Sequence, residues 1–163
     1  MTRPVIAIIG AGPYGLSLAA HMAERNIEHR IFGSPMQFWS QIAEAGGERY
    51  LKSYCFGTDI STPRPGYSFA DYSEPRGLKT FESCSIGFAA YGKWFQQKIV
   101  PWVETHDVTK MSKLNEQFYI TLKSGEEFLA SNVVVATGLS YFAYVPSILS
   151  RLPAPLAAQK VYL

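Results

Sequence analysis

The sequence predicts an α/β domain built on a parallel sheet, with a small antiparallel β ribbon added to it. Two continuous, β-branched apolar runs, at residues 5–9 and 132–136, have the pattern of parallel strands buried on both faces. The first run is followed by a helical repeat of apolar residues and then by another strand-like run, which together make a β-α-β unit. Three further strand-like runs between residues 107 and 129 supply the ribbon.

The composition is that of one folded domain. The chain has 163 residues, of which 47% are hydrophobic, 14% aromatic and 17% charged, and this excludes a disordered or fibrous protein. The formal net charge is only +2 and no basic run is present, so we expect no nucleic-acid partner. No stretch approaches the roughly twenty apolar residues that span a bilayer, so we expect no membrane association either.

The cysteines and histidines have no metal-binding pattern. Cys55 and Cys84 are too few for a disulfide framework and are not spaced as metal ligands. We therefore expect buried thiols, no metal site and a reduced, cytoplasmic setting. His21, His29 and His106 are also not spaced as ligands, and we expect them on the surface or in the core rather than at a catalytic centre.

The first β-α-β unit is the most legible part of the chain. The strand Val5–Ile9 ends at Gly10. A helix over residues 13–25 follows, in which Leu16, Ala19 and Ala20 recur at helical spacing, and a second strand at His29–Phe32 completes the unit. Pro13 falls in the first helical turn, where its missing N–H does no harm.

A second helix is predicted over residues 35–44. Ser34 has the character of its N-cap, with Pro35 at the first helical position and Gln37 closing a capping box. Residues 48–85 show no sustained periodicity, and we expect loops there with at most short local elements. A third helix carries Tyr91 and Phe95 at helical spacing and ends near Val100, because Pro101 follows.

The second half of the chain is predicted to be mainly strands. Runs at 107–114, Gln117–Leu122 and 126–129 form the antiparallel ribbon, the last two joined by a turn at 123–125. The separate buried strand at 132–136 then runs into Thr137 and Gly138.

Residues 10–15 match the pattern G-x-G-x-x-G between a predicted strand and a predicted helix. Gly10 allows the tight turn, Gly12 lets a pyrophosphate approach the backbone, and Gly15 lets the helix pack closely on the strand. The anion would meet free N–H groups at the helix N-terminus. The pattern therefore predicts a dinucleotide-binding, Rossmann-like domain, although a plain glycine-rich turn has the same letters.

The acidic residue that normally accompanies this pattern is missing. An Asp or Glu is expected at the end of the second strand, about twenty residues on, to hold the adenosine ribose, but Gly33 and Ser34 stand there. No arginine follows that would indicate a 2′-phosphate. The ribose would then be held by Ser34, by backbone groups or by a residue that the sequence does not locate, and Ser34 could equally be only the helix cap.

The segments GAGPYG at 10–15 and VVVATG at 133–138, with the stretch through Trp39 and the ribbon at Asp107 and Val108, resemble the FAD-binding portion of class B flavin monooxygenases. That group contains flavin-containing monooxygenases, Baeyer–Villiger enzymes and N-hydroxylases. The resemblance spans nearly the whole chain. Its two anchor motifs also occur in flavoprotein disulfide reductases, whose close-spaced dithiol is not matched by Cys55 and Cys84.

The resemblance implies a set of FAD-binding residues. It places the pyrophosphate at the glycine-rich loop, the ribose at Ser34 and Gln37, and the adenine at the backbone of Val108. It also places Trp39 close to FAD and brings the backbone of the ATG turn, residues 136–138, beside the cofactor. The implied cofactor-binding residues are Gly10, Gly12, Pro13, Tyr14, Gly15, Ser34, Gln37, Trp39, Val108, Ala136, Thr137 and Gly138. No catalytic residue is identified.

Some of these positions have structural alternatives. Trp39 could be a core residue, and Tyr14 could merely cover the loop. The sequence also departs from the family pattern, because Gly33 replaces the usual Glu and Phe38 precedes Trp39 where glycines are common. Loss of the Glu should weaken ribose binding or shift it to other donors.

The resemblance also implies what lies beyond these residues. Related monooxygenases continue from the strand that corresponds to residues 132–136 into an NADPH-binding domain, which has a second G-x-G-x-x-G pattern. Only one such pattern occurs in this sequence. We therefore expect residues 1–146 to be an incomplete FAD-binding domain and residues 147–163 a linker, in a fragment or a natural truncation. The 10 Tyr, 10 Phe and 3 Trp are expected to include exposed rings that dock the missing domain or promote self-association.

The function expected from the sequence is the FAD-binding portion of an NADPH-dependent monooxygenase that hydroxylates an unidentified small molecule, inactive as this fragment. In the complete enzyme NADPH would reduce FAD and oxygen would be used on the substrate. Two alternatives remain: a non-catalytic nucleotide-binding module and an NAD(P)-dependent dehydrogenase domain.

Overall fold

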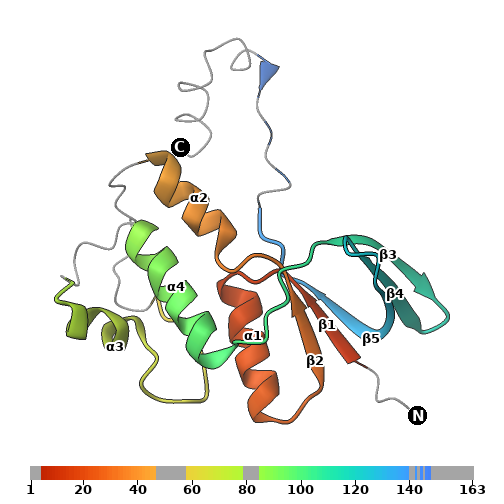
Figure 1. Cartoon of the computed structure of the whole chain (residues 1–163), viewed down its shortest axis with the longest axis horizontal. Coiled ribbons are helices and arrows are strands. Elements are labelled where there is room, and N and C mark those ends of the chain that lie inside the picture. Colours follow the sequence, from red (N-terminus) through yellow and green to blue (C-terminus); the bar gives the residue numbers. More distant parts are fainter. Residues whose placement is uncertain are drawn as a thin grey trace.

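The computed structural model describes residues 5–46, 58–78 and 85–139, together with residues 142, 144, 146 and 147. Figure 1 shows the helices gathered on one side of a sheet whose far edge is a hairpin. The elements follow in the order β1 (Val5–Ile9), α1 (Pro13–Glu24), β2 (His29–Phe32), α2 (Gln37–Gly46), α3 (Phe69–Ser73), the 3-10 turn η1 (Glu74–Arg76), α4 (Ser85–Ile99), β3 (Val108–Leu114), β4 (Gln117–Leu122) and β5 (Glu127–Val135).

The strands form one five-stranded mixed sheet in the order β2-β1-β5-β4-β3. β1 pairs in parallel with both β2 and β5, whereas β4 pairs antiparallel with β3 and β5. The predicted α/β class, with a parallel sheet and an antiparallel ribbon, is therefore confirmed. The ribbon is a continuation of the parallel sheet, because β5 belongs to both parts.

The third strand of the predicted ribbon and the apolar strand after it are one strand, β5, so the predicted break between them was wrong. The first half of β5 pairs with β4 and the second half with β1. The register shifts where the halves meet: Val5 pairs with Ala130, and the next pair uses Asn132. Ser131 is the extra residue, and its hydroxyl donates to the Val5 carbonyl at 3.4 Å. The polar pair at 131–132 is a bulge inside a continuous strand.

β1 and β2 have buried residues on both faces, as the apolar run of β1 predicts, whereas the second apolar run, in β5, is only partly buried and its Val135 is 64% exposed. Ile8 of β1 and Ile31 of β2 belong to the core beneath the helices. Their neighbours Ala7 and Phe32 belong to a second core on the opposite face, formed with the ribbon. This division follows from the two-residue period of a strand. The sheet is thereby fixed between two apolar layers, and its carboxyl edge remains available for a binding site.

The core beneath the helices is largely aromatic. Tyr91 of α4 is fully buried, and its ring lies 5.3 Å from that of Phe69 and 6.3 Å from that of Phe95, between centroids. α4 ends at Ile99, one residue before the predicted limit. Within the region predicted as loops, α3 is a short helix with a capping box between Ser68 and Asp71.

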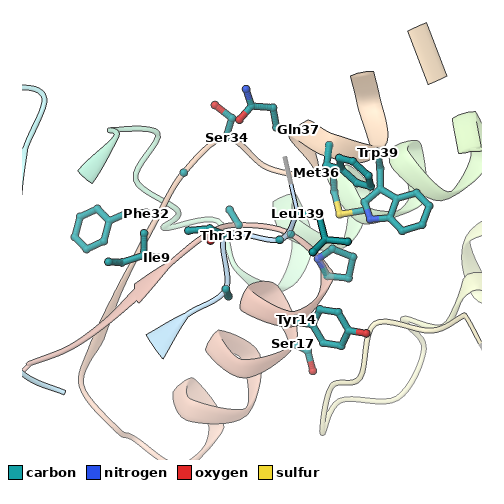
Figure 2. A pocket seen from close by; sticks show the side chains of 18 of the residues that line it. Ile9, Tyr14, Ser17, Phe32, Ser34, Met36, Gln37, Trp39, Thr137 and Leu139 are labelled. Atoms are coloured by element: carbon teal, nitrogen blue, oxygen red, sulfur yellow. The ribbon is translucent and has the colours of Figure 1, made fainter. Parts of the chain in front are cut away.

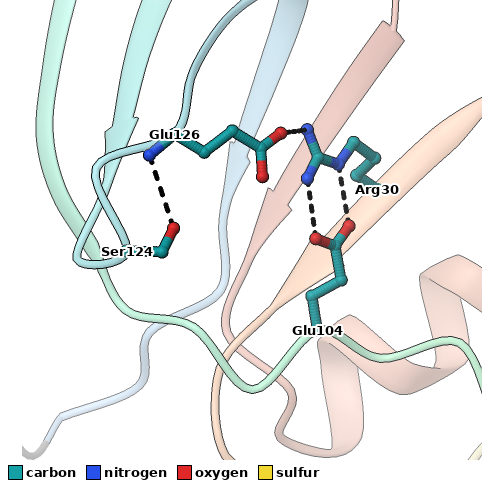
Figure 3. Close-up of polar contacts among 4 residues, drawn as sticks. All are labelled: Arg30, Glu104, Ser124 and Glu126. Atoms are coloured by element: carbon teal, nitrogen blue, oxygen red, sulfur yellow. Dashed lines mark hydrogen bonds and ion pairs between the residues drawn. The ribbon is translucent and has the colours of Figure 1, made fainter.

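At the outer edge of β2, the backbone of Glu104 pairs with the strand, and Arg30 forms ion pairs with Glu104 and Glu126 (Figure 3). The backbone of Glu104 bonds to that of Ile31 and of Gly33, each at 2.9 Å. Arg30 donates two hydrogen bonds to the Glu104 carboxylate and a third to Glu126, all at 2.7 Å. These bonds raise the pKa of Arg30 and hold the pKa of Glu126 below its usual value. Arg30 thus joins β2 to the segment after α4 and to the β4–β5 turn.

Several predictions fall on residues that the structure does not describe. Cys55 and Cys84 lie outside the described ranges, and so does the predicted linker apart from Ser147. The predicted domain boundary therefore stays a prediction.

Candidate functional site

A cleft of about 1060 Å³ opens at the carboxyl ends of the parallel strands. Its walls include Ile9 at the end of β1, Phe32 at the end of β2 and Ala136 just after β5. In open α/β sheets this edge is where ligands bind, because the loops that leave the strands diverge there. Figure 2 shows the side chains around this cleft, with the first turns of α1 below them.

The cleft brings together nearly all the residues that the sequence proposed as a binding site. Gly15 alone among them does not line it. The predicted residues that do line it are Gly10, Gly12, Pro13, Tyr14, Ser34, Gln37, Trp39, Val108, Ala136, Thr137 and Gly138. They come from four separate stretches of the chain, so the fold assembles them into one surface. Their part in cofactor binding stays a prediction.

The glycine-rich loop and the ATG turn meet through their backbones. Gly10 has a φ of 118°, and a Cβ atom on it would overlap the carbonyl oxygen of Ala136. The Ala136 N–H donates to the carbonyl of Ile9 at 2.7 Å, which extends the β1–β5 pairing into the loops. Only glycine satisfies both the positive φ and the close approach. The two motifs therefore form a single backbone platform.

Gly12 presents open space to the cleft. Its φ of −79° and ψ of −174° are ordinary extended values, and a Cβ built on it has no neighbour within 4 Å. It is the N-cap of α1, yet no side chain caps that helix and no acidic residue lies in its first turn. The N–H groups of the first turn and the positive end of the helix dipole are thus left to a ligand. A bound anion would complete this terminus.

Gly15 acts in packing rather than at the cleft surface. It is buried on α1, and a Cβ atom on it would overlap the carbonyl oxygen of Gly10. The third glycine of the pattern therefore lets α1 approach the loop after β1, which fixes the direction of the helix terminus.

Gly33 stands where the ribose-binding acid was expected, and the structure gives a physical reason for the glycine. Its φ is 124°, a region that other residues avoid. A Cβ atom there would come within 3.3 Å of the backbone nitrogen of Ala11. The Gly33 N–H donates to the backbone carbonyl of Glu104 at 2.9 Å, which ties this residue to the segment after α4. A glutamate would be strained in this backbone conformation.

The prediction that Ser34 caps a helix starting at Pro35 was wrong. α2 begins at Gln37, because Met36 has a φ of 54° and cannot belong to a right-handed helix. The Gln37 N–H donates to the carbonyl of Ser34 at 3.3 Å, closing a turn instead of a capping box. Ser34 and Gln37 are both exposed, and in Figure 2 their side chains lie together at the upper rim of the cleft.

The other side of the cleft is apolar and aromatic. Trp39 is half-buried and packs edge-on against Phe88, with ring centroids 4.7 Å apart. It packs against the core, which confirms one of the two alternatives left open by the sequence, and it also lines the cleft. Its contact with FAD stays a prediction. Tyr14 and Leu139 are 87% and 73% exposed, and Figure 2 shows them on the same side as Trp39. A flat apolar group would find partners here.

A further wall of the cleft was not predicted. Residues 58–61 line it and are held from behind by Tyr91, whose hydroxyl accepts the Ile60 N–H at 3.0 Å and donates to the carbonyl of Tyr67 at 2.8 Å. Burial raises the pKa of Tyr91 to about 12. Ser61 also accepts a bond from Ser17 of α1 at 2.8 Å. No periodicity marks this segment, so only its tertiary contacts identify it.

Two polar residues at the start of the ribbon also line the cleft. They are His106 and Asp107, directly before Val108. His106 was expected to be a surface or core residue, and its place at the cleft comes from the entry of β3 into the sheet, which the sequence does not locate in space.

The described residues contain neither a candidate metal site nor a candidate membrane-spanning helix. In residues 5–46, 58–78 and 85–139, no group of three or more His, Cys, Asp or Glu side chains could hold a metal ion. Among the described helices, none has both the length and the apolar character needed to cross a membrane.

Comparison with solved structures reveals related folds. A flavin-containing monooxygenase from Stenotrophomonas maltophilia is similar, with a TM-score of 0.69, 23% identity, and coverage of 88% of this chain and 41% of the other. An ornithine hydroxylase from Pseudomonas aeruginosa has a TM-score of 0.68 and 18% identity, covering 93% and 42%. A bacillithiol disulfide reductase from Staphylococcus aureus has a TM-score of 0.65 and 20% identity, covering 85% and 39%.

The chain thus spans about two fifths of the length of these proteins. No protein-family model matches the sequence, and a search of curated proteins found no match. At these identities the likeness carries the fold alone. The described part of the chain has the Rossmann-like α/β fold of the flavin-containing monooxygenase, the ornithine hydroxylase and the bacillithiol disulfide reductase, which confirms the predicted resemblance at the level of the fold.

Proposed function

We propose that this chain binds FAD, as the FAD-binding portion of an NADPH-dependent flavin monooxygenase that acts on a small molecule. The observation that carries the proposal is the uncapped N-terminus of α1 beside the open side of Gly12, both facing a cleft at the carboxyl ends of three parallel strands. This arrangement is suited to a pyrophosphate. The cleft is also large enough for more than a mononucleotide, since typical small-molecule sites occupy roughly 300–1,000 Å³.

The residues present are compatible with each part of FAD. The pyrophosphate would be held by backbone N–H groups after Gly12. The exposed side chains of Ser34 and Gln37 at the rim supply hydrogen-bonding groups for the ribose in place of the missing acid. The flavin ring would lie toward Trp39 and Leu139, where the lining is apolar. When bound, FAD supplies the redox chemistry, and the protein orients it and excludes water.

The monooxygenase assignment is supported by the shared fold of the flavin-containing monooxygenase and the ornithine hydroxylase. Because the chain spans about two fifths of those proteins, NADPH oxidation, oxygen use and substrate binding belong to the proposal for the whole enzyme. The disulfide reductase has the same fold, so the reaction has to be decided by experiment.

The test is a binding titration with purified chain and three ligands. FAD should bind and develop the visible absorption of bound oxidised flavin, FMN should bind more weakly because it lacks the adenosine half, and NADH should not compete. A colourless protein that is stabilised against heat by NADH but not by FAD would reject the proposal in favour of a dehydrogenase domain.

A second experiment addresses the reaction in a longer protein that contains this chain. Oxygen consumption coupled to NADPH oxidation would support a monooxygenase, and reduction of a disulfide substrate would select a reductase instead. FAD binding without NADPH oxidation would select a non-catalytic flavin-binding module.

A further inference from the structure

Met36 is in an unusual backbone conformation for its residue type. Among the described residues, the non-glycine residues with positive φ are Asn26, Met36 and Asn115. Asparagine tolerates this region because its side chain bonds locally, whereas methionine has no such compensation. Met36 is also completely buried. Such a strained residue persists only where surrounding contacts hold it.

The Met36 side chain packs into a notch in the surface of α4, formed where Gly92 has no side chain. A Cβ atom on Gly92 would lie 2.5 Å from both the Sδ and the Cε atoms of Met36. Gly92 lies in the interior of α4, where glycine is a poor helix former, so its value there is the space it leaves. The other glycine of this helix, Gly87, offers a comparison, since its Cβ would meet only the ring of Phe69 at 3.8 Å.

The backbone of Met36 links the notch to the cleft. Its N–H donates to the carbonyl of Ala11 in the glycine-rich loop at 3.0 Å, and its carbonyl accepts the N–H of Ser40 in the first turn of α2 at 2.9 Å. The residues around it in the turn, Ser34 and Gln37, present their side chains at the cleft rim. The position of Met36 therefore sets the spacing between the glycine-rich loop and the rim.

We propose that Gly92 and Met36 are positioning residues for the dinucleotide: the insertion of Met36 into the Gly92 notch fixes the Ser34–Gln37 turn against the glycine-rich loop. Gly92 does not line the cleft, whereas Met36 does, so the effect of Gly92 on binding is transmitted through Met36. This inference rests on the proposed FAD binding.

The experiment compares FAD affinity and the visible spectrum of bound flavin in the unmodified chain with four variants: Gly92→Ala, Met36→Ala, the two combined, and Gly87→Ala as the matched control. Gly92→Ala should push Met36 out and weaken FAD binding on the order of tenfold. Gly87→Ala, the same change in the same helix, should leave the affinity unchanged. The double variant should bind FAD more tightly than Gly92→Ala, because the new methyl group enters space that Met36 has vacated.

The outcomes separate this inference from the proposed function. If the unmodified chain does not bind FAD, the proposed function fails. If it binds FAD, and a folded Gly92→Ala variant binds equally tightly, the positioning role is overturned while the function stands. Additive losses in the double variant would also overturn it. Should Gly92→Ala not fold, Met36→Ala decides, since unchanged FAD affinity in that variant would contradict the inference.

Discussion

The carbonyl oxygen of Ala136 occupies the space that a side chain on Gly10 would need. These residues lie at opposite ends of the described chain and terminate two neighbouring strands, β1 and β5. The contact makes the glycine-rich loop and the ATG turn one unit, so the geometry of the cleft depends on the β1–β5 pairing. It also separates two roles for glycine in the loop, since Gly10 permits the close approach of Ala136, whereas Gly12 has open space beside it.

Replacing Gly10 should destabilise the fold severely. We expect Gly10→Ala to lower the free energy of unfolding by about 2–6 kcal/mol, the sum of a strained φ and a backbone overlap of about 1–3 kcal/mol each. Gly125→Ala is the control, because Gly125 has a φ of 90° and open space around it, so only the φ strain applies. Urea unfolding of both variants measures the difference. Equal losses would mean that the contact with Ala136 has no energetic weight.

The Arg30 cluster should stabilise the sheet edge measurably. Arg30→Met should cost about 1–3 kcal/mol of unfolding free energy, because the half-buried Glu104 carboxylate loses two charge-assisted hydrogen bonds. Lys113→Met removes an exposed ion pair with Glu116 and should cost less than about 1 kcal/mol. Chemical unfolding at neutral pH distinguishes them, and similar small losses in both would show that the cluster is not important for stability.

The same cluster gives the stability an acid dependence. The hydrogen bond from Arg30 holds the pKa of Glu126 below its ordinary value of 4.5. A depressed carboxyl pKa contributes stability that is present above the unfolded-state pKa and is lost as the pH falls through the folded-state pKa. The unmodified protein should therefore lose stability more steeply than Glu126→Gln as the pH is lowered below 4.5. Parallel profiles from urea titrations would contradict this.

Tyr91 should make the fold sensitive to alkali. Burial raises its pKa from 10.0 to about 12, so the folded state keeps a proton that the unfolded state releases. Stability is then fully present below pH 10.0 and falls as the pH rises toward about 12. Tyr91→Phe should show a shallower fall in that range, although it starts about 1–3 kcal/mol lower because the Ile60 N–H loses its acceptor. Thermal unfolding across this range is the measurement.

The sequence predicts the secondary structure well where the pattern is local. Val5–Ile9, His29–Phe32 and Gln117–Leu122 are confirmed as strands with the same bounds, because each is bounded by turn residues and has an uninterrupted pattern. The sequence predicted two strands where β5 is continuous, because two adjacent polar residues occur both at a β-bulge, as at Ser131 here, and in a loop between two strands. The capping box at Ser34 has the correct letters, but the burial of Met36 overrides it.

The parts of the site that the sequence did not predict depend on tertiary contacts. From the sequence, Gly33 indicates only that the ribose-binding acid is missing. Its positive φ and the hydrogen bond from its N–H to the Glu104 carbonyl show why a glycine stands there. The wall at residues 58–61 is defined by Tyr91, and the notch at Gly92 by Met36. None of these pairs has a sequence spacing that a periodic pattern could reveal.

If a dinucleotide pyrophosphate binds at the open side of Gly12, a side chain at that position must block it, and a comparison of FAD affinity between the unmodified chain and Gly12→Val measures this. Gly12 has an ordinary φ and no neighbour within 4 Å of its Cβ position, so the variant should keep its unfolding free energy within about 1 kcal/mol. We predict that the folded variant no longer binds FAD detectably. Unchanged FAD affinity in the folded variant would show that no pyrophosphate binds beside Gly12.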